Sequence, residues 1–185
     1  MGNLILNFSK LLNQKATHTP SAQHVLDSEY YKRIEAIQFS MSHDDGMKTE
    51  DVRNADIILL GVSRTSKTPT SIYLANRGYK TLNIPLVTGQ EIPEVLKKEP
   101  DNFCVIGLTV EPSRLSDIRS NRLEIMKEVN IPNYSDLEFI KDEIDNSKKL
   151  FKKYGWPIID VTRKSVEETA ASVIKILEIK KRKKQ

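Results

Sequence analysis

Residues 56–86 constrain the fold more than any other part of the chain, because they join two apolar runs through a short polar loop and a helical pattern. "DIILL" (56–60) predicts a buried strand, and "KTLNIPL" (80–86) predicts a second one. Between them, Pro69 suits the first turn of a helix and Gly78 suits its left-handed C-terminal cap. This order predicts a βαβ crossover, which implies parallel strands in a buried sheet.

The other apolar and amphipathic patterns extend this unit into a larger domain. Residues 102–110 and 156–162 are further apolar runs and predict a third and a fourth strand. Residues 26–42 and 113–128 have the spacing of amphipathic helices. We therefore predict an α/β fold with a mostly parallel sheet covered by helices.

Two more helices are predicted to begin at capping boxes, in which a glutamate follows a serine three residues later. These boxes are Ser135 with Glu138 and Ser165 with Glu168. Each is followed by apolar residues at helical spacing, which we assign to the core. The two stripes comprise Leu137, Ile140, Ile144 and Phe151, and Val166, Ala170, Val173 and Leu177.

The composition suits a single compact domain without disulfides. The chain has 185 residues, of which 38% are apolar, and its one cysteine, Cys104, lies in an apolar run. A single cysteine forms no intrachain disulfide, so we expect a buried, reduced thiol and a cytoplasmic protein. No apolar run approaches the roughly 20 residues of a membrane helix, and residues 1–8 do not resemble a signal peptide, so no membrane partner is expected.

The excess positive charge lies at the C-terminus. The formal net charge is +4, and removing the five positive charges of residues 180–184 leaves −1. The high pI therefore does not describe a basic face, and no nucleic-acid partner is expected. We interpret residues 180–184 as a solvated helix end, with contact to nucleic acid or acidic lipid as the alternative.

The loop between the first predicted strand and helix has the length of a phosphate-binding loop. Residues 61–68, "GVSRTSKT", match GxxxxGK[ST] except that Ser66 replaces the second glycine. We expect an exposed Lys67 to reach phosphate oxygens, Thr68 to bind Mg²⁺ and Arg64 to supply a second cation. The alternative is an ordinary polar turn, because serine adopts the positive φ of such a glycine less readily. The predicted phosphate-binding residues are Gly61, Val62, Ser63, Arg64, Thr65, Ser66, Lys67 and Thr68.

Acidic residues elsewhere supply candidates for metal binding and proton transfer. Asp160, after the fourth strand, and Glu111, after the third, are candidates to support Mg²⁺, or else cap helices or form salt bridges. In "HDDG", residues 43–46, Asp44 or Asp45 could orient an acceptor hydroxyl and give a second hold on Mg²⁺. The alternative is a solvated turn that ends a helix at its glycine.

Several long segments, in order and with plausible spacing, resemble one known family. They are "RIEAIQFSMSHDDG", "ADIILLGVSRTSKTPTSIYLANRGYK", "GLTVEPSRLSDIRSNRL", "YSDLEFIKDEI" and "GWPIIDVTRKSVEETA". The family comprises the pyruvate, phosphate dikinase regulatory proteins and the related phosphoenolpyruvate synthase regulatory proteins. The resemblance covers residues 20–177. Members commonly have serine in "SRTSKT", so the resemblance accounts for Ser66.

The resemblance implies a bifunctional phosphotransferase in an α/β domain of P-loop type. An ADP-dependent serine/threonine kinase would inactivate the dikinase or synthase by phosphorylating a threonine, and a phosphate-dependent phosphorylase would remove that phosphate as pyrophosphate. Residues 61–68 would hold the β-phosphate region of ADP in one direction and inorganic phosphate in the other. We expect Asp44, Asp45, Arg64 and Lys67 to be catalytic, and Thr68 and Asp160 to hold Mg²⁺.

The chain departs from the family at its start and at Glu111, where the resemblance leads us to expect aspartate. We assign residues 1–23 to an N-terminal arm or remnant, 24–179 to the phosphotransferase domain and 180–185 to a basic tail. Because family members carry a long additional segment before the matching part, we expect a protein that folds but docks its target less well. The alternatives are a catalytically impaired remnant that only binds nucleotide, and a small-molecule kinase. A homodimer is compatible with these assignments.

Overall fold

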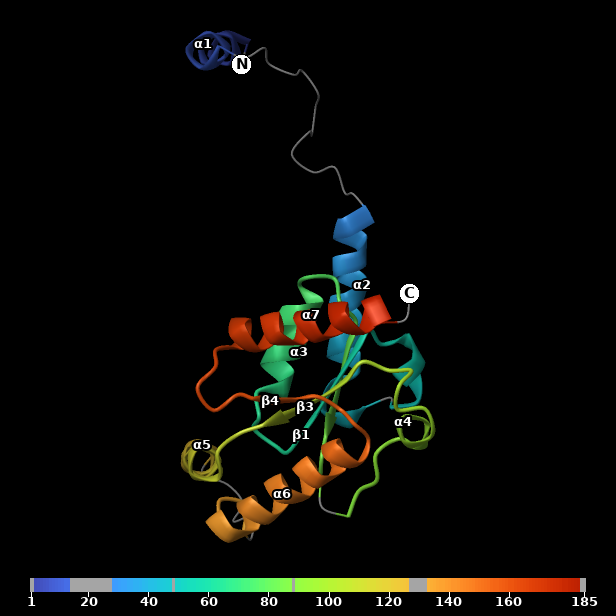
Figure 1. Ribbon diagram of the computed structural model, residues 1–185. Coiled ribbons are helices and arrows are strands. Elements are labelled where there is room, and N and C mark those ends of the chain that lie inside the picture. The colour runs from blue at the N-terminus through green and yellow to red at the C-terminus, as the bar shows by residue number, and fades with distance from the viewer. Residues whose placement is uncertain (1, 14–27, 48, 88, 127–132, 184–185) are drawn as a thin grey trace.

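The computed structural model describes residues 2–13, 28–47, 49–87, 89–126 and 133–183. Four strands form one parallel sheet in the order β2-β1-β3-β4 (Figure 1). They are β1 (Ile57–Gly61), β2 (Thr81–Pro85), β3 (Val105–Thr109) and β4 (Ile158–Asp160). Each lies within or overlaps a strand predicted from the sequence, so the predicted α/β fold with a parallel sheet is confirmed.

Helices lie on both sides of this sheet (Figure 1). The described helices are α1 (Gly2–Leu12), α2 (Ser28–Ser42), α3 (Lys67–Ala75), α4 (Glu94–Lys98), α5 (Pro112–Met126), α6 (Leu137–Lys153) and α7 (Val166–Lys183), with 3₁₀ turns η2 (Asp44–Gly46) and η3 (Thr49–Asn54). Helix α7 therefore continues through residues 180–183 of the predicted tail, and residues 184–185 lie outside the described part. Residues 14–23 of the predicted N-terminal arm also lie outside it, whereas residues 2–12 of that arm form α1.

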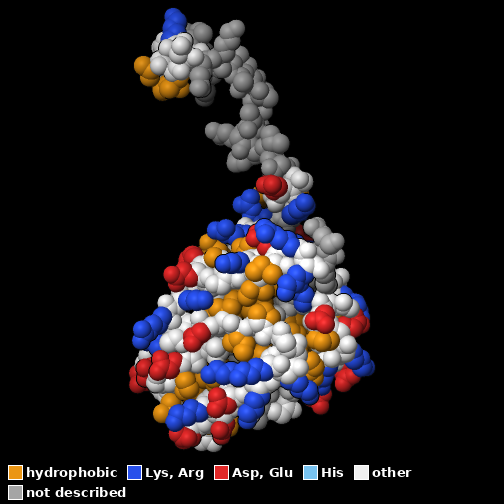
Figure 2. All heavy atoms as spheres, in the orientation of Figure 1, with side chains coloured by type: hydrophobic (Ala, Val, Ile, Leu, Met, Phe, Trp, Pro, Cys, Tyr) orange, Lys and Arg blue, Asp and Glu red, His pale blue; other side chains and the backbone are white. Residues whose placement is uncertain are grey.

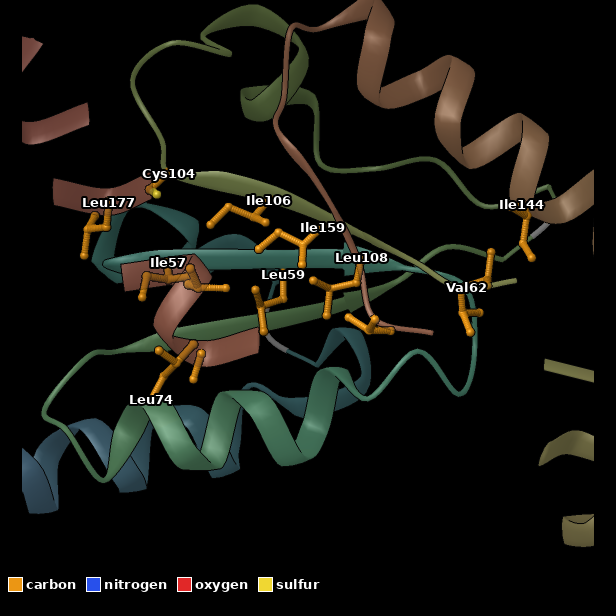
Figure 3. Close-up of a cluster of buried hydrophobic side chains, with 14 of the residues drawn as sticks. Ile57, Leu59, Val62, Leu74, Cys104, Ile106, Leu108, Ile144, Ile159 and Leu177 are labelled. Atoms are coloured by element: carbon orange, nitrogen blue, oxygen red, sulfur yellow. The ribbon is translucent and has the colours of Figure 1, made fainter. Parts of the chain in front are cut away.

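Strand β1 is buried on both faces because its side chains alternate between two apolar clusters. Ile57 and Leu59 belong to the first cluster, whereas Ile58 and Leu60 belong to the second. In Figure 3 the first cluster gathers side chains of β1, β3 and β4 against α3 and α7. Cys104 lies in the same cluster as a free thiol, and burial raises its pKa. Each fully buried aliphatic side chain contributes about 1.5–3 kcal/mol, so this strand anchors the sheet.

One of the two predicted capping boxes forms. At the start of α7, Ser165 N donates to Glu168 Oε2 over 2.9 Å and Glu168 N donates to Ser165 Oγ over 3.2 Å. At the start of α6 the prediction is wrong by one residue, because the cap is Asp136, whose carboxylate accepts from Phe139 N over 2.9 Å. Leu137 consequently becomes the first helical residue and is 40% exposed instead of buried in the core.

The outer edge of β2 is covered by the end of α2 and the residues that follow it. Ser40 Oγ accepts a hydrogen bond from Thr81 N over 3.0 Å, and His43 O accepts one from Asn83 N over 3.3 Å. These bonds satisfy two amide groups that an edge strand would otherwise leave unpaired. They also place "HDDG" beside the carboxyl end of β2.

Charged side chains of both signs are interspersed on the face shown in Figure 2. Within the described ranges, the helices lack the length and apolar character required to cross a bilayer.

Gly107 of β3 leaves room for the ring of Phe151 from α6. A Cβ atom at this position would lie 2.7 Å from Phe151 Cγ and closer still to two other ring atoms. We expect Gly107→Ala to lower the free energy of unfolding by about 1–3 kcal/mol through overpacking, as measured by urea denaturation. The control is Gly107→Ala combined with Phe151→Leu, in which the smaller side chain recovers part of the loss. Purely additive losses would show that the two residues do not clash.

Ser66, in the crossover from β1 to α3, has φ +59° and ψ +24° and so adopts the left-handed conformation that glycine would take there. We expect Ser66→Gly to raise the free energy of unfolding by about 0.5–1 kcal/mol, because this conformation costs other residues about 1–2 kcal/mol and glycine regains part of that. Ser120→Gly in α5 is the control and should lower it by about 0.5 kcal/mol. Urea denaturation of both variants measures the effect, and a loss in Ser66→Gly would contradict the expectation.

Candidate active site

The polar loop at the carboxyl end of β1 packs directly against β3. A Cβ atom on Gly61 would lie 2.7 Å from Thr65 Oγ1 and 2.8 Å from Leu108 O, so a larger residue would separate the loop from the sheet. Thr65 Oγ1 donates to Val62 O over 2.9 Å and is itself buried. The loop therefore turns tightly at the end of the central strand, where ligands bind in open parallel sheets.

Lys67 is buried, with 5% of its surface exposed, whereas the sequence led us to expect an exposed side chain. Its Nζ donates to Val62 O over 2.9 Å. Burial lowers the pKa of Lys67 from 10.5 to about 8, although the carboxylates of Asp45 and Asp44 act to raise it. Near neutral pH the loop therefore holds a largely protonated ammonium group with little solvation.

The segment "HDDG" meets the loop at Thr68. Thr68 Oγ1 donates to Asp44 Oδ1 over 3.0 Å, and Asn83 Nδ2 donates to Thr68 Oγ1 over 3.1 Å and to Asp44 Oδ1. The three side chains come from α3, the 3₁₀ turn η2 and β2. They form a compact polar cluster, hereafter the Asp44 cluster.

The Asp44 cluster has the donor chemistry of a magnesium site. Asn83 Oδ1 is buried and has no hydrogen-bond partner among the described residues. Mg²⁺ prefers oxygen ligands and often binds through only one or two carboxylates together with phosphate oxygens. The described residues include no cluster of three or more His, Cys, Asp or Glu side chains suited to a metal. The hydroxyl of Thr68 and the carboxylate of Asp44 nevertheless fit a metal that also binds the phosphate of a ligand.

Asp45 lies in a different environment from Asp44, because it lines cavities and Asp44 accepts a hydrogen bond from Thr68. Asp45 has φ +50° and lines a cavity of about 400 Å³ together with Arg64, Ser66, Lys67 and Thr68 of the loop. It also lines an adjoining cavity of about 360 Å³ that extends past β2. Asp45 therefore borders both cavities.

His43 holds the start of "HDDG" in place. Its Nδ1 lies 2.7 Å from Phe39 O and its Nε2 lies 3.0 Å from Asp51 Oδ2, and its ring stacks on Phe39 with 3.9 Å between centroids. The imidazole is buried and is engaged on both nitrogens. His43 thus positions the two aspartates and does not itself line the loop cavity.

A buried arginine connects the loop to the opposite wall of the cavity. Arg119 of α5 is 1% exposed and donates to Tyr134 O over 3.0 Å and to Ser63 O over 3.3 Å. It also forms an ion pair with Glu143 at 2.8 Å, and its guanidinium lies 4.8 Å from the centre of the Tyr134 ring. These contacts hold the loop and the residues before α6 at a set separation.

Sequence reasoning missed Asn83, Arg119 and Tyr134 as parts of this site. Two of them carry a signal that could have been noticed. Asn83 is a polar residue within an apolar strand, and Arg119 lies four residues after the buried Leu115 on the same helical face. Tyr134 has no such pattern, because it lies outside any regular element.

The structure does not bring Asp160 or Glu111 to the loop. Both line a separate cavity of about 500 Å³ at the ends of β3 and β4. Asp160 Oδ1 accepts hydrogen bonds from Thr162 N at 2.8 Å and from Thr162 Oγ1 at 2.5 Å. Partial burial acts to raise the pKa of Asp160, but these hydrogen bonds lower it overall. Asp160 therefore closes a turn after β4, whereas Asp44 is the carboxylate beside Thr68.

A family model described as kinase/pyrophosphorylase matches residues 1–174. A relative from Pelagibacter ubique is 70% identical over 181 residues, which cover 98% of this chain and 66% of the relative. A relative from Bartonella bacilliformis is 49% identical over 94% of this chain and 62% of its own length, and one from Sphingopyxis alaskensis is 52% identical over 92% and 63%. All three bear the name "Putative pyruvate, phosphate dikinase regulatory protein".

This chain spans 62–66% of the length of these three relatives. Both kinds of match extend over most of the present sequence. The resemblance noted in the sequence is thereby confirmed, and the chain belongs to the kinase/pyrophosphorylase family.

Proposed function

We propose that this protein regulates pyruvate, phosphate dikinase as an ADP-dependent threonine kinase and as a phosphate-dependent pyrophosphorylase. One observation carries the proposal: the ammonium of Lys67, the hydroxyl of Thr68 and the carboxylate of Asp44 lie together at the carboxyl end of β1. Such a set suits phosphoryl transfer, which depends mainly on positioning and charge neutralisation. The names of the relatives support the dikinase as target.

In this proposal, Lys67 and Arg64 bind the phosphate at the N-terminus of α3. The dipole of the helix adds positive potential there. Lys67 Nζ can turn from Val62 O to a phosphate oxygen at little cost, because Thr65 Oγ1 still donates to that carbonyl over 2.9 Å. The loop is therefore built to release its buried ammonium without leaving a carbonyl unpaired.

The Asp44 cluster would hold Mg²⁺ next to this phosphate. Thr68 Oγ1 and Asp44 Oδ1 are its oxygen donors, and Asn83 Nδ2 holds both in place through hydrogen bonds. When bound, Mg²⁺ neutralises charge on the phosphate oxygens. Thr68 links the metal site to the loop, because it follows Lys67 directly.

Asp45 would act as the general base for the acceptor threonine. In the kinase direction the threonine hydroxyl gives its proton to Asp45, and its oxygen forms a bond to the β-phosphorus of ADP. The bond from that phosphorus to the bridging oxygen breaks, and AMP leaves. Asp45 lines both cavities, which supports an arrangement with the nucleotide in the loop cavity and the acceptor threonine approaching through the second one.

The decisive experiment is incubation of the protein with purified pyruvate, phosphate dikinase, Mg²⁺ and ADP labelled in its β-phosphate. We expect label on a threonine of the dikinase and its release as pyrophosphate when excess inorganic phosphate is added. The full-length Pelagibacter ubique relative serves as reference. Transfer from ATP alone, or to a small metabolite in place of the dikinase, would show that the proposal is wrong.

Asn substitutions should separate the two aspartates. We expect Asp45→Asn to lower the rate of transfer by about 100-fold or more while ADP affinity changes less than about threefold, because the lost carboxylate acts on the acceptor. Asp44→Asn should instead weaken the Mg²⁺-dependent part of ADP binding. Calorimetry and single-turnover assays measure both effects, with the exposed Asp117→Asn as control. Parental activity in Asp45→Asn would assign "HDDG" to a structural turn.

Phosphate affinity should depend on the protonation of Lys67. Because the pKa of Lys67 is about 8 and phosphate binds the ammonium form, the association constant should fall about tenfold per pH unit above about pH 8. Below that pH the lysine is already protonated and contributes no further change. Calorimetry between about pH 7 and 10 tests this, with Lys67→Met as a variant that binds weakly and lacks this dependence. A flat profile in the parent would place the phosphate away from Lys67.

A further inference from the structure

The loop cavity has a second wall that the phosphate-binding loop does not supply. Helix α5 contributes Ile118 and Arg122 to it, and Tyr134 contributes from the segment before α6. The Tyr134 hydroxyl lies 3.4 Å from Ser63 Oγ of the loop. Arg122 and Tyr134 are separated from the loop by more than fifty residues of sequence, and the fold brings them to the same cavity.

Arg119 holds this wall against the loop. Its guanidinium donates to Tyr134 O on one side and to Ser63 O on the other, at 3.0 and 3.3 Å. The positive charge of Arg119 is balanced by Glu143 at 2.8 Å, so it serves as a brace and is not a ligand-facing cation. The separation between loop and wall is therefore set by buried contacts before any ligand binds.

The loop cavity is lined by more positively charged side chains than one phosphate group requires. Arg64, Lys67 and Arg122 line it, and Asp45 is the carboxylate among the lining residues. The volume of about 400 Å³ lies within the usual range of ligand cavities, about 300–1,000 Å³. A single phosphate bound by Lys67 and the α3 terminus would leave Arg122 without an anionic partner.

We propose that Arg122 and Tyr134 form a second phosphate subsite, so that the cavity binds two linked phosphates, as in pyrophosphate. This inference rests on the proposed function and adds the specificity-determining residues to it. Arg122 is suited to the role because its guanidinium can bind phosphate oxygens in bidentate fashion. The Tyr134 hydroxyl supplies a neutral donor beside it.

The phosphorylase direction of the proposed reaction requires two adjoining subsites. An oxygen of inorganic phosphate forms a bond to the phosphorus of phosphothreonine, and the bond from that phosphorus to the threonine oxygen breaks. The proton of the attacking phosphate passes to the threonine oxygen. The pyrophosphate that results spans both subsites, and the diphosphate of ADP presents the same linkage in the kinase direction.

The test is calorimetric titration of the whole protein with inorganic phosphate and, separately, with pyrophosphate. The variants are Arg122→Gln, Arg122→Lys and the control Arg114→Gln, which changes an exposed arginine of the same helix outside the cavity lining. We expect the parent to bind pyrophosphate at least tenfold more tightly than phosphate. Arg122→Gln should weaken pyrophosphate at least tenfold, about 1.4 kcal/mol, and phosphate less than twofold.

Arg122→Lys should lose part of the pyrophosphate affinity, because it keeps the charge but not the bidentate geometry. Arg114→Gln should match the parent for both anions. Equal weakening of both anions by Arg122→Gln, or no weakening of either, would overturn the inference. The titrations need neither ADP nor the dikinase, so a failure of threonine phosphorylation would leave their result intact. Conversely, full pyrophosphate affinity in Arg122→Gln alongside normal phosphorylation would overturn only the second subsite.

Discussion

The site depends on the interactions that hold the buried ammonium group of Lys67. Removing an ammonium group from water is costly, and the low pKa of Lys67 reports that cost. Val62 O offsets it through a hydrogen bond, and the carboxylates of Asp45 and Asp44 offset it through charge. Strand β1 ends at Gly61, so Val62 lies in the loop and its carbonyl is available to the lysine. Helix α2 leads into "HDDG", which brings the two carboxylates near the lysine.

The Arg119–Glu143 pair performs the corresponding task on the other side of the loop. Buried ion pairs add little net stability, because desolvation cancels much of their attraction. Their directional contacts can still determine which surfaces meet. Arg119 bonds two backbone carbonyls from distant segments, so α5, α6 and the loop share one geometry. The cavity between them is therefore a built feature of the fold.

Local sequence patterns predicted the four strands and the helices α2, α3, α5, α6 and α7, but they missed α1 and α4 and misplaced the cap of α6. Apolar runs identified all four strands. Strands β1 and β3 are buried along their whole length and leave a continuous signal, whereas β4 buries only its central residue, Ile159. The box at Ser165 formed, but at Ser135 the adjacent Asp136 took the cap instead, since aspartate caps helices as well as serine does. Lysine is usually exposed, so the sequence alone predicts an exposed Lys67. The tertiary structure buries it and pairs its Nζ with Val62 O.

The sequence by itself determined the βαβ unit, the loop at residues 61–68 and the family, because these are written in contiguous residues. The tertiary structure decided which carboxylate meets Thr68. Asp160 and Asp44 both looked suitable, but β4 pairs with β3 and so lies two strands from β1. Asp44 follows a helix that covers the edge of β2, the direct neighbour of β1. Strand order depends on long-range pairing of buried backbone groups, which no local pattern of residues encodes.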